Sequence, residues 1–130
     1  MHKITFKLEP VSASRPRVTR WGVYYADKYT QFRKDMAKLL LGNRTLYASP
    51  LKLNVSFYFT IPKSYSKKKR DELDGEYCVG VSDLDNLEKA LYDCMNGTVY
   101  VDDKYIVHHE VKKMWVKEGG RIEVIIEKIK

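Results

Sequence analysis

Hydrophobic and polar residues alternate without interruption across residues 51–59, near the middle of the chain. Every second position of that segment is Leu, Val or Phe, a period typical of a β-strand that buries one face. We predict that this strand ends before Pro62, because proline cannot donate to a sheet ladder. Residues 4–8 alternate in the same way and predict a strand that is ended by Pro10.

Other segments repeat their apolar residues with the period of an α-helix. The spacing predicts one helix over residues 28–41, which ends at Gly42. A second helix is predicted around residues 84–95, with Gly97 as its C-terminal stop. Its apolar arc consists of Leu84, Leu87, Ala90, Leu91, Cys94 and Met95. The lysine-rich stretch 64–73 is expected to form a short exposed helix.

The last part of the chain predicts strands over residues 105–117 and 121–129. Glu118-Gly119-Gly120 separates them, and because glycine supplies the positive φ of a tight turn, we predict a β-hairpin. Strands and helices mix without strict βα alternation. This indicates an α+β fold, with a mixed or antiparallel sheet packed with two main helices. No linker or repeat divides the sequence, so a single domain over residues 1–130 is expected.

The composition is typical of a globular protein. Hydrophobic residues make up 44% and charged residues 32% of the chain, as in folded soluble domains. No apolar run approaches the roughly 18 residues of a membrane-spanning helix, and no charged-then-apolar leader is recognisable, so we expect a cytoplasmic protein without membrane contact. The two cysteines have neither metal-ligand spacing nor a disulfide framework around them.

The charge balance of the chain favours a partner that carries phosphate groups. Lys and Arg number 24 against 17 Asp and Glu, which gives a formal net charge of +7 and a pI near 9.3. The run Lys67-Lys68-Lys69-Arg70 is either a solvated helix face or a contact with a nucleic-acid backbone.

A second basic segment lies in residues 11–25, which are expected to be irregular. Arg15, Arg17 and Arg20 alternate there with aromatic residues. Those aromatics are Trp21, Tyr24 and Tyr25. They either stack on unpaired bases of a nucleic acid or fill the core beneath the segment, and the sequence does not choose between these roles.

Carboxylates gather within a short part of this basic chain. Asp83 and Asp85 open the predicted second helix, and Asp102-Asp103 follow Gly97. The positive end of a helix dipole favours ionised carboxylates, and Mg²⁺ is usually held by one or two carboxylates together with substrate oxygens and water. Lys89 follows Asp85 on the polar stripe of the helix, where it is placed to meet a phosphate or the charge of a transition state.

Each acidic pair has a simpler interpretation when taken alone. Asp at a helix start is commonly a cap, and Asp-Asp before a strand is commonly a solvated turn. Asp93, at the edge of the polar stripe, is interpreted as a structural residue. The metal-site hypothesis therefore depends on the whole set of spaced residues.

That set resembles the signature of RusA-like Holliday junction resolvases. The matching positions are Asp83-Leu84-Asp85-Asn86-Leu87, Lys89, Asp93, Asn96-Gly97, Tyr100, Asp102-Asp103, Ile106 and Lys113. Arg15-Pro16-Arg17 and Ile61-Pro62-Lys63 resemble the phage-borne branch of that family more loosely. The sequence departs from many relatives at Val81-Ser82, where those proteins have a basic residue before the first Asp.

The resemblance implies a dimeric, Mg²⁺-dependent enzyme, with Mn²⁺ as an alternative metal, that nicks four-way DNA junctions symmetrically. The family's catalytic carboxylates correspond to Asp83, Asp85 and Asp103, and its essential lysine to Lys89. Asp102 matches a further acidic position of the family. The expected partners are branched DNA and a second copy of the chain, with backbone contacts assigned to the two basic segments.

Two other functions remain open from the residues themselves. One is a non-catalytic DNA-binding protein, in which the Asp side chains only cap a helix and stabilise a turn. The other is a Mg²⁺-dependent nuclease that acts on flaps, replication forks or RNA.

Overall fold

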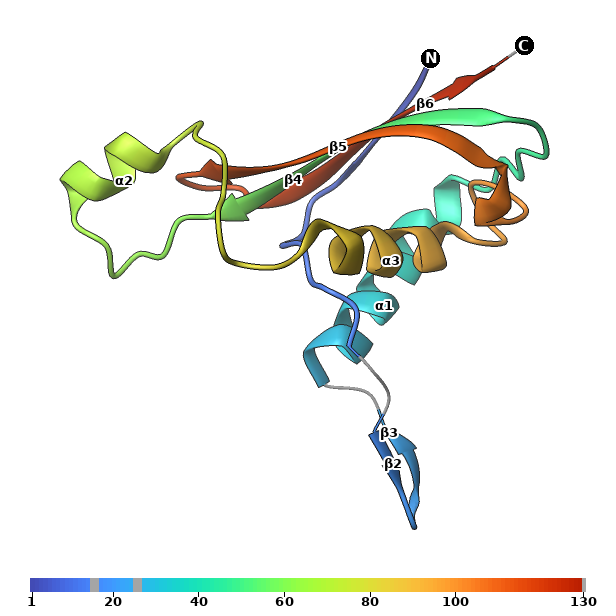
Figure 1. The fold of residues 1–130 in the computed structure, drawn as a ribbon, viewed down its shortest axis with the longest axis horizontal. Helices are drawn as coiled ribbons and strands as arrows, with labels where there is room; N and C mark the ends of the chain where they lie inside the picture. The colour runs from blue at the N-terminus through green and yellow to red at the C-terminus, as the bar shows by residue number, and fades with distance from the viewer. Residues whose placement is uncertain (15–16, 25–26, 130) are drawn as a thin grey trace. The chain divides into compact units, whose positions relative to one another are not determined.

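The computed structural model describes residues 1–14, 17–24 and 27–129 (Figure 1). The chain divides into two compact units. The first consists of Met1–Pro10, Ser49–Leu84 and Lys104–Lys130, and the second of Val11–Ala48 and Asp85–Asp103. None of the described helices is both long enough and apolar enough to cross a membrane.

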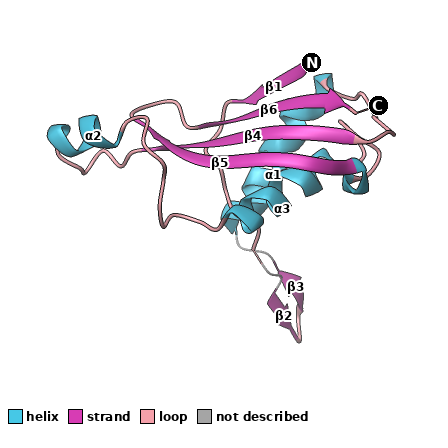
Figure 2. Cartoon of the chain, turned by 45° about the horizontal axis from the view of Figure 1, so that its top comes forward, coloured by secondary structure: helices cyan, strands magenta, loops and turns pink. Residues whose placement is uncertain are grey.

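The first unit is built on a mixed sheet of four strands in the order β1-β6-β4-β5 (Figure 2). The strands are β1 (His2–Phe6), β4 (Leu51–Thr60), β5 (Ile106–Val116) and β6 (Arg121–Lys128). β6 pairs antiparallel with both β1 and β4, whereas β4 and β5 are parallel. This unit also contains the short helix α2 (Lys67–Leu73), whose N-terminus is capped by Ser66: the Ser66 side chain accepts the Lys69 N–H.

Because apolar and polar residues alternate along the strands, one face of this sheet is apolar. Val55 on β4 pairs with Val124 on β6, and Ile4 on β1 pairs with the same residue from the other side. All three are buried. Because β4 is central and its odd-numbered residues from 51 to 57 are almost wholly buried, its register is strongly specified.

The predicted hairpin between the last two strands is wrong. β5 and β6 have the predicted extents to within one or two residues, but β4 lies between them. The Gly120 N–H donates a 3.0 Å hydrogen bond to Thr60 Oγ1, so the connection crosses the end of β4. Strands two places apart in a sheet are separated by roughly 10 Å, which four extended residues span easily.

The second unit contains the remaining elements. They are β2 (Arg17–Thr19), β3 (Gly22–Tyr24), α1 (Asp27–Leu39), the 3₁₀ turn η1 (Leu40–Gly42) and α3 (Leu84–Met95), whose first residue belongs to the first unit. The short 3₁₀ turn η2 (Asp103–Tyr105) spans the boundary. The helices confirm the predicted ones, whereas the segment expected to be irregular contains the antiparallel pair β2–β3. The α+β class and the mixed sheet are confirmed; the single domain stays a prediction.

Candidate functional site

Helix α3 presents the predicted polar stripe. Leu87 and Leu91 are fully buried, so the opposite side of the helix carries the exposed Asp85 and Lys89. These two residues are one turn apart and project from the same face. Asp85 Oδ1 also accepts the backbone N–H of Asn86 at 3.0 Å, which orients its carboxylate at the first turn.

A tight loop follows α3 and fixes the position of the second acidic pair. Gly97, with φ of +77°, donates its N–H to the Tyr100 carbonyl at 2.8 Å. The Tyr100 hydroxyl donates in turn to the Tyr92 carbonyl of the helix at 2.9 Å. Because Tyr100 is fully buried, these bonds tie the loop to the C-terminal half of α3.

The loop brings Asp103 back to the C-terminal end of α3. Its carboxyl group hydrogen-bonds to Asp102 and Asn96, and Asp93 lies near enough to act on it electrostatically. Desolvation is the largest cause that raises the pKa of Asp103, followed by Asp102; the Asn96 hydrogen bond opposes these effects. The carboxyl groups of Asp102 and Asp103 thus lie side by side, an arrangement that a bound cation would stabilise.

Asp85 and Asp103 therefore lie at opposite ends of α3. Asp85 is in the first turn and Asn96, the contact of Asp103, immediately follows the last. Eleven residues of helix separate Asp85 from Asn96 by about 16 Å at 1.5 Å per residue. Ligands of one Mg²⁺ lie about 2 Å from the ion, so Asp85 and Asp103 of one chain do not share one.

Asp83 precedes α3 and is exposed. The residue before it is held by β5, because Lys113 Nζ donates a 2.5 Å hydrogen bond to the Ser82 carbonyl. Among the residues that the structure describes, no three His, Cys, Asp or Glu side chains are grouped so that they could hold a metal ion. The predicted assignment of Asp83, Asp85 and Asp103 as metal ligands stays a prediction.

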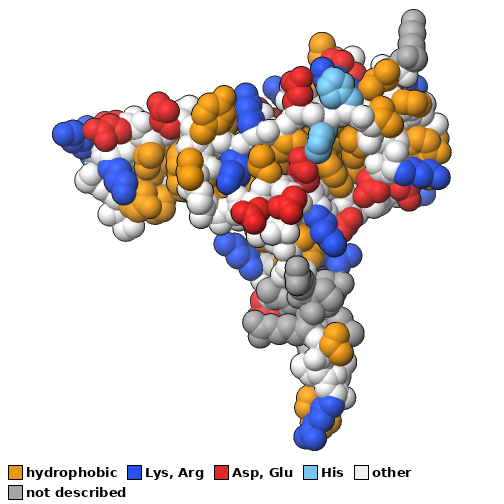
Figure 3. Space-filling model, in the orientation of Figure 1, with side chains coloured by type: hydrophobic (Ala, Val, Ile, Leu, Met, Phe, Trp, Pro, Cys, Tyr) orange, Lys and Arg blue, Asp and Glu red, His pale blue; other side chains and the backbone are white. Residues whose placement is uncertain are grey.

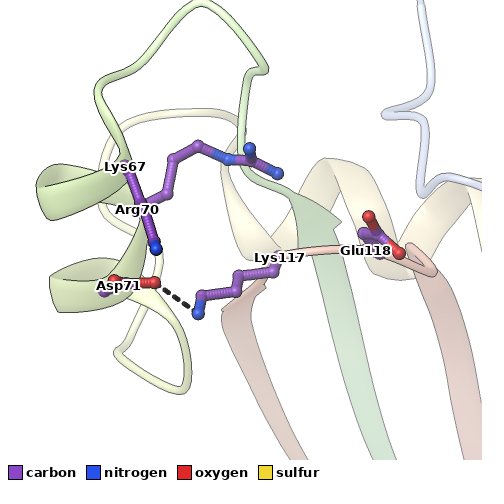
Figure 4. Close-up of a pocket in the computed structure, with 5 residues that line it drawn as sticks. All are labelled: Lys67, Arg70, Asp71, Lys117 and Glu118. Atoms are coloured by element: carbon purple, nitrogen blue, oxygen red, sulfur yellow. Dashed lines mark ion pairs between the residues drawn. The ribbon is translucent and has the colours of Figure 1, made fainter.

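The basic run of α2 lines a pocket of about 420 Å³ at the end of the sheet (Figure 4). Lys67 and Arg70 face Lys117, which follows β5, and the Lys117 ammonium pairs with Asp71. The Arg70 side chain reaches away from α2 (Figure 4), and its Nε is buried with no hydrogen-bond partner among the described residues. An arginine guanidinium and two lysine ammonium groups around one pocket favour an anionic ligand.

The other members of the basic run are exposed. Lys68 and Lys69 do not line the pocket, and the Lys69 ammonium lies 4.2 Å from the centre of the Tyr65 ring. The sequence interpretation missed Lys117, because a lysine just before a glycine turn is an ordinary solvated residue. Lys117 lines the pocket because the C-terminal end of β5 lies beside α2 in the fold.

The second basic segment is described in part. Arg15 and Tyr25 lie outside the described residues, and Arg17 is placed by its backbone, which pairs with Tyr24 across β2–β3. Arg20 and Trp21 form the turn of this hairpin. Trp21 is 75% exposed, which excludes the core role left open by the sequence for this residue.

Comparisons with known proteins include a family model and several relatives. The model of the family described as Endodeoxyribonuclease RusA matches residues 7–127. An uncharacterized protein of Bacillus subtilis, YqaN, is 31% identical over 137 aligned residues, which cover 98% of this chain and 96% of the relative. The crossover junction endodeoxyribonuclease RusA of Shigella sonnei is 29% identical over 113 residues, covering 86% of this chain and 76% of that protein.

A more local match concerns the RusA protein of Escherichia coli K12. It is 44% identical over 45 residues, which cover 34% of this chain and 38% of that protein.

Proposed function

The chain belongs to the RusA family of endodeoxyribonucleases, and from this premise we propose that it cleaves four-way DNA junctions by paired, symmetric nicks that depend on Mg²⁺. Members of this family are crossover junction endonucleases, which are hydrolases of phosphodiester bonds. The pairing of nicks, the metal and a role in recombination and repair are parts of the proposal. The observation that carries it is the exposed stripe of Asp85 and Lys89 on α3 in a chain that matches this family over residues 7–127.

The proposed roles follow from the chemistry of each group. Asp83, Asp85 and Asp103 offer hard carboxylate oxygens, which suit Mg²⁺ and also Mn²⁺. When bound, such a cation supplies Lewis acidity and a water of lowered pKa. Lys89 is a compact ammonium that stabilises negative charge at the scissile phosphate. Asn96 holds the Asp103 carboxylate in position.

The separation of Asp85 from Asp103 supports a homodimer as the active form. Two copies related by a two-fold axis, with their α3 helices antiparallel, bring Asp85 of one copy towards Asp103 of the other. The same operation builds two equivalent sites, one for each of two strands of a symmetric junction. The proposal therefore places the acidic groups of each site on both copies.

An exposed apolar residue next to each acidic group supports contacts with a second copy. Val81, which precedes Asp83, is 46% exposed, and Val101, which precedes Asp102, is 49% exposed. Apolar residues next to polar groups are common where protein surfaces meet.

We propose that the α2 pocket binds a DNA phosphate. Lys67, Arg70 and Lys117 bring three cations to it against the carboxylates of Asp71 and Glu118. Arginine is well suited to a phosphate, because its planar group donates two parallel hydrogen bonds. This contact would position an arm of the substrate without reading its sequence.

The test is a panel of labelled four-way junction, flap, fork, duplex and single-stranded DNA, together with RNA. Each substrate is incubated with the protein in Mg²⁺, in Mn²⁺ and in EDTA. The proposal predicts cleavage of the four-way junction at paired positions with Mg²⁺ and none in EDTA. Preferred cleavage of flaps, forks or RNA would support the alternative nuclease, and no product on any substrate would support the non-catalytic DNA-binding protein.

A further inference from the structure

The turn of the β2–β3 hairpin presents an aromatic ring that folding does not bury. The paired strands leave Arg20 and Trp21 as a two-residue turn, the shortest common hairpin connection. Trp21 is 75% exposed, and Val18 on the preceding strand is 80% exposed. An exposed tryptophan at a hairpin tip contributes little to a core, and most of its surface is accessible to another molecule.

The turn holds this ring in a defined arrangement. Thr19 Oγ1 accepts the Trp21 N–H at 3.1 Å and donates to the Gly22 carbonyl at 3.3 Å. Gly22 has φ of +130°, a conformation that residues with a side chain rarely adopt. The Arg20 guanidinium lies 4.8 Å from the centre of the Trp21 ring, a cation–π contact that joins a charge to the flat surface.

The charge of the hairpin indicates the chemistry of its partner. Residues 11–26 contain three arginines and no acidic residue, and basic and hydrophobic side chains occur together at the tip of the hairpin (Figure 3). A flat ring beside cations fits a partner with planar rings and negative charge. Nucleic acid combines both properties in every nucleotide, whereas the Asp and Glu side chains of an acidic peptide supply the charge without a planar ring.

We propose that Trp21 stacks on an exposed base at the branch point of DNA, with Arg20 beside the adjoining phosphate. In a continuous duplex both faces of each base are covered by neighbours, so the ring has nothing to stack on without unstacking the helix. At a branch point the stack is interrupted and a base face is open. Trp21 therefore makes binding selective for branched DNA, and this inference rests on the proposed function.

The contact is measured directly by tryptophan fluorescence in EDTA, where no cleavage occurs. Trp115 is the second of two tryptophans, so Trp115→Phe leaves Trp21 as the single emitter. Titration with a four-way junction is expected to reduce the emission of Trp21 by about half or more. Linear duplex of the same length is expected to change it by much less, because stacking needs an open base.

Binding affinities of variants form the second readout. Trp21→Ala should weaken junction binding about tenfold, as expected for loss of one base–aromatic stack, and change duplex binding less than about twofold. Trp21→Phe should recover most of the affinity, and Val18→Ala, on the same hairpin, should bind as the parent. Sedimentation of Trp21→Ala should give the parental oligomeric state.

Several outcomes overturn the inference. Unchanged Trp21 emission on junction binding, equal loss of junction and duplex affinity in Trp21→Ala, or no junction preference in the parent protein each contradict it. A changed oligomeric state in Trp21→Ala would instead assign the ring to a contact between copies. Because every measurement is made without metal, this inference and the proposed nuclease function can fail separately. If a junction quenches the Trp21 emission but the protein cuts no junction when Mg²⁺ is present, the proposed nuclease function is wrong and this inference stands.

Discussion

The side chain of Asn96, directly after α3, hydrogen-bonds to the carboxyl group of Asp103. Asn96 and Asp103 are seven positions apart, and the loop that joins them is fixed to the helix by the Tyr100 hydroxyl. The amide thus holds a carboxylate that its other neighbours, Asp102 and Asp93, repel.

Asn96→Ala should lower the affinity of the enzyme for Mg²⁺. Without the amide, Asp103 loses the hydrogen bond that favours its ionised, oriented form, and loss of such a supporting contact typically costs 10–100-fold in metal affinity or activity. We expect the Mg²⁺ concentration for half-maximal junction cleavage to rise about tenfold. Gln31→Ala, which removes an exposed amide on α1, is the matched control and should be unaffected. An unchanged Mg²⁺ requirement in Asn96→Ala would separate Asn96 from the site.

Lys89→Ala should slow cleavage by roughly 100-fold, because a group that stabilises transition-state charge is worth about that much. Junction affinity, measured by fluorescence anisotropy in EDTA, should change less than about threefold. Lys38→Ala, another exposed lysine on a helix, serves as the control for loss of one positive charge. A normal cleavage rate in Lys89→Ala would remove its assigned role, and a matched loss of rate and affinity would make it a binding residue only.

Arg70→Ala should reduce the salt dependence of DNA binding. One fewer neutralised phosphate lowers the slope of log affinity against log salt by close to one unit. The slope is measured by titrating junction DNA at several salt concentrations in EDTA. Lys117→Ala should act in the same direction, although it also leaves Asp71 without the ammonium that lowers the pKa of its carboxyl group. Lys7→Ala, an exposed lysine outside the pocket, should leave the slope unchanged; an equal effect at Lys7 would argue against a specific phosphate site.

Tyr100→Phe should lower the free energy of unfolding by about 1 kcal/mol, because it removes the hydrogen bond from a buried tyrosine to the Tyr92 carbonyl of the helix. Urea denaturation measures this difference. Tyr105→Phe, at a less buried position of the same segment, should cost less. Equal stability of Tyr100→Phe and the parent would mean that water or another donor replaces the bond.

The helices and strand extents were predictable because their signal is local. The apolar arc of α3 repeats every three to four residues and ends at a glycine that adopts positive φ, so the sequence alone defines its face and both ends. The alternation of 51–59 likewise required a strand with one buried side. Helix α2 was predicted with its first residues too early, because Ser66 caps it.

Strand partners were not predictable in the same way. Glu118-Gly119-Gly120 is a sound hairpin signal, but such a signal carries no information about a third strand that inserts between the two. The most apolar strand, β4, takes the central place and separates β5 from β6. Contacts between distant segments, such as that of Lys117 with Asp71, also leave no trace in a local pattern.

The candidate site was predicted as a set of residues but not as an arrangement. Spacing indicated that Asp85 and Lys89 share a helix face, and the structure agrees. The assignment of Asp103 as a metal ligand together with Asp83 and Asp85 stays a prediction, and the structure places its carboxyl group beside Asn96, just after the last turn of α3. Sequence spacing groups Asp85 and Asp103 in one short segment, but helix α3 between them holds their carboxyl groups apart.

Mixing two inactive variants tests the central claim most directly, namely that Asp85 and Asp103 act together in junction cleavage across a dimer. Asp85→Asn and Asp103→Asn should each bind four-way junctions in EDTA and fail to cut them in Mg²⁺. In a mixed dimer, the Asp85→Asn copy supplies its Asp103 to the intact Asp85 of the other copy, so one complete site re-forms. We predict that unfolding and refolding the variants together restores nicking of one strand per junction. The absence of nicking, with mixed dimers demonstrated by differently tagged copies, would contradict the shared site, and parental cleavage by either single variant would contradict the catalytic assignment itself.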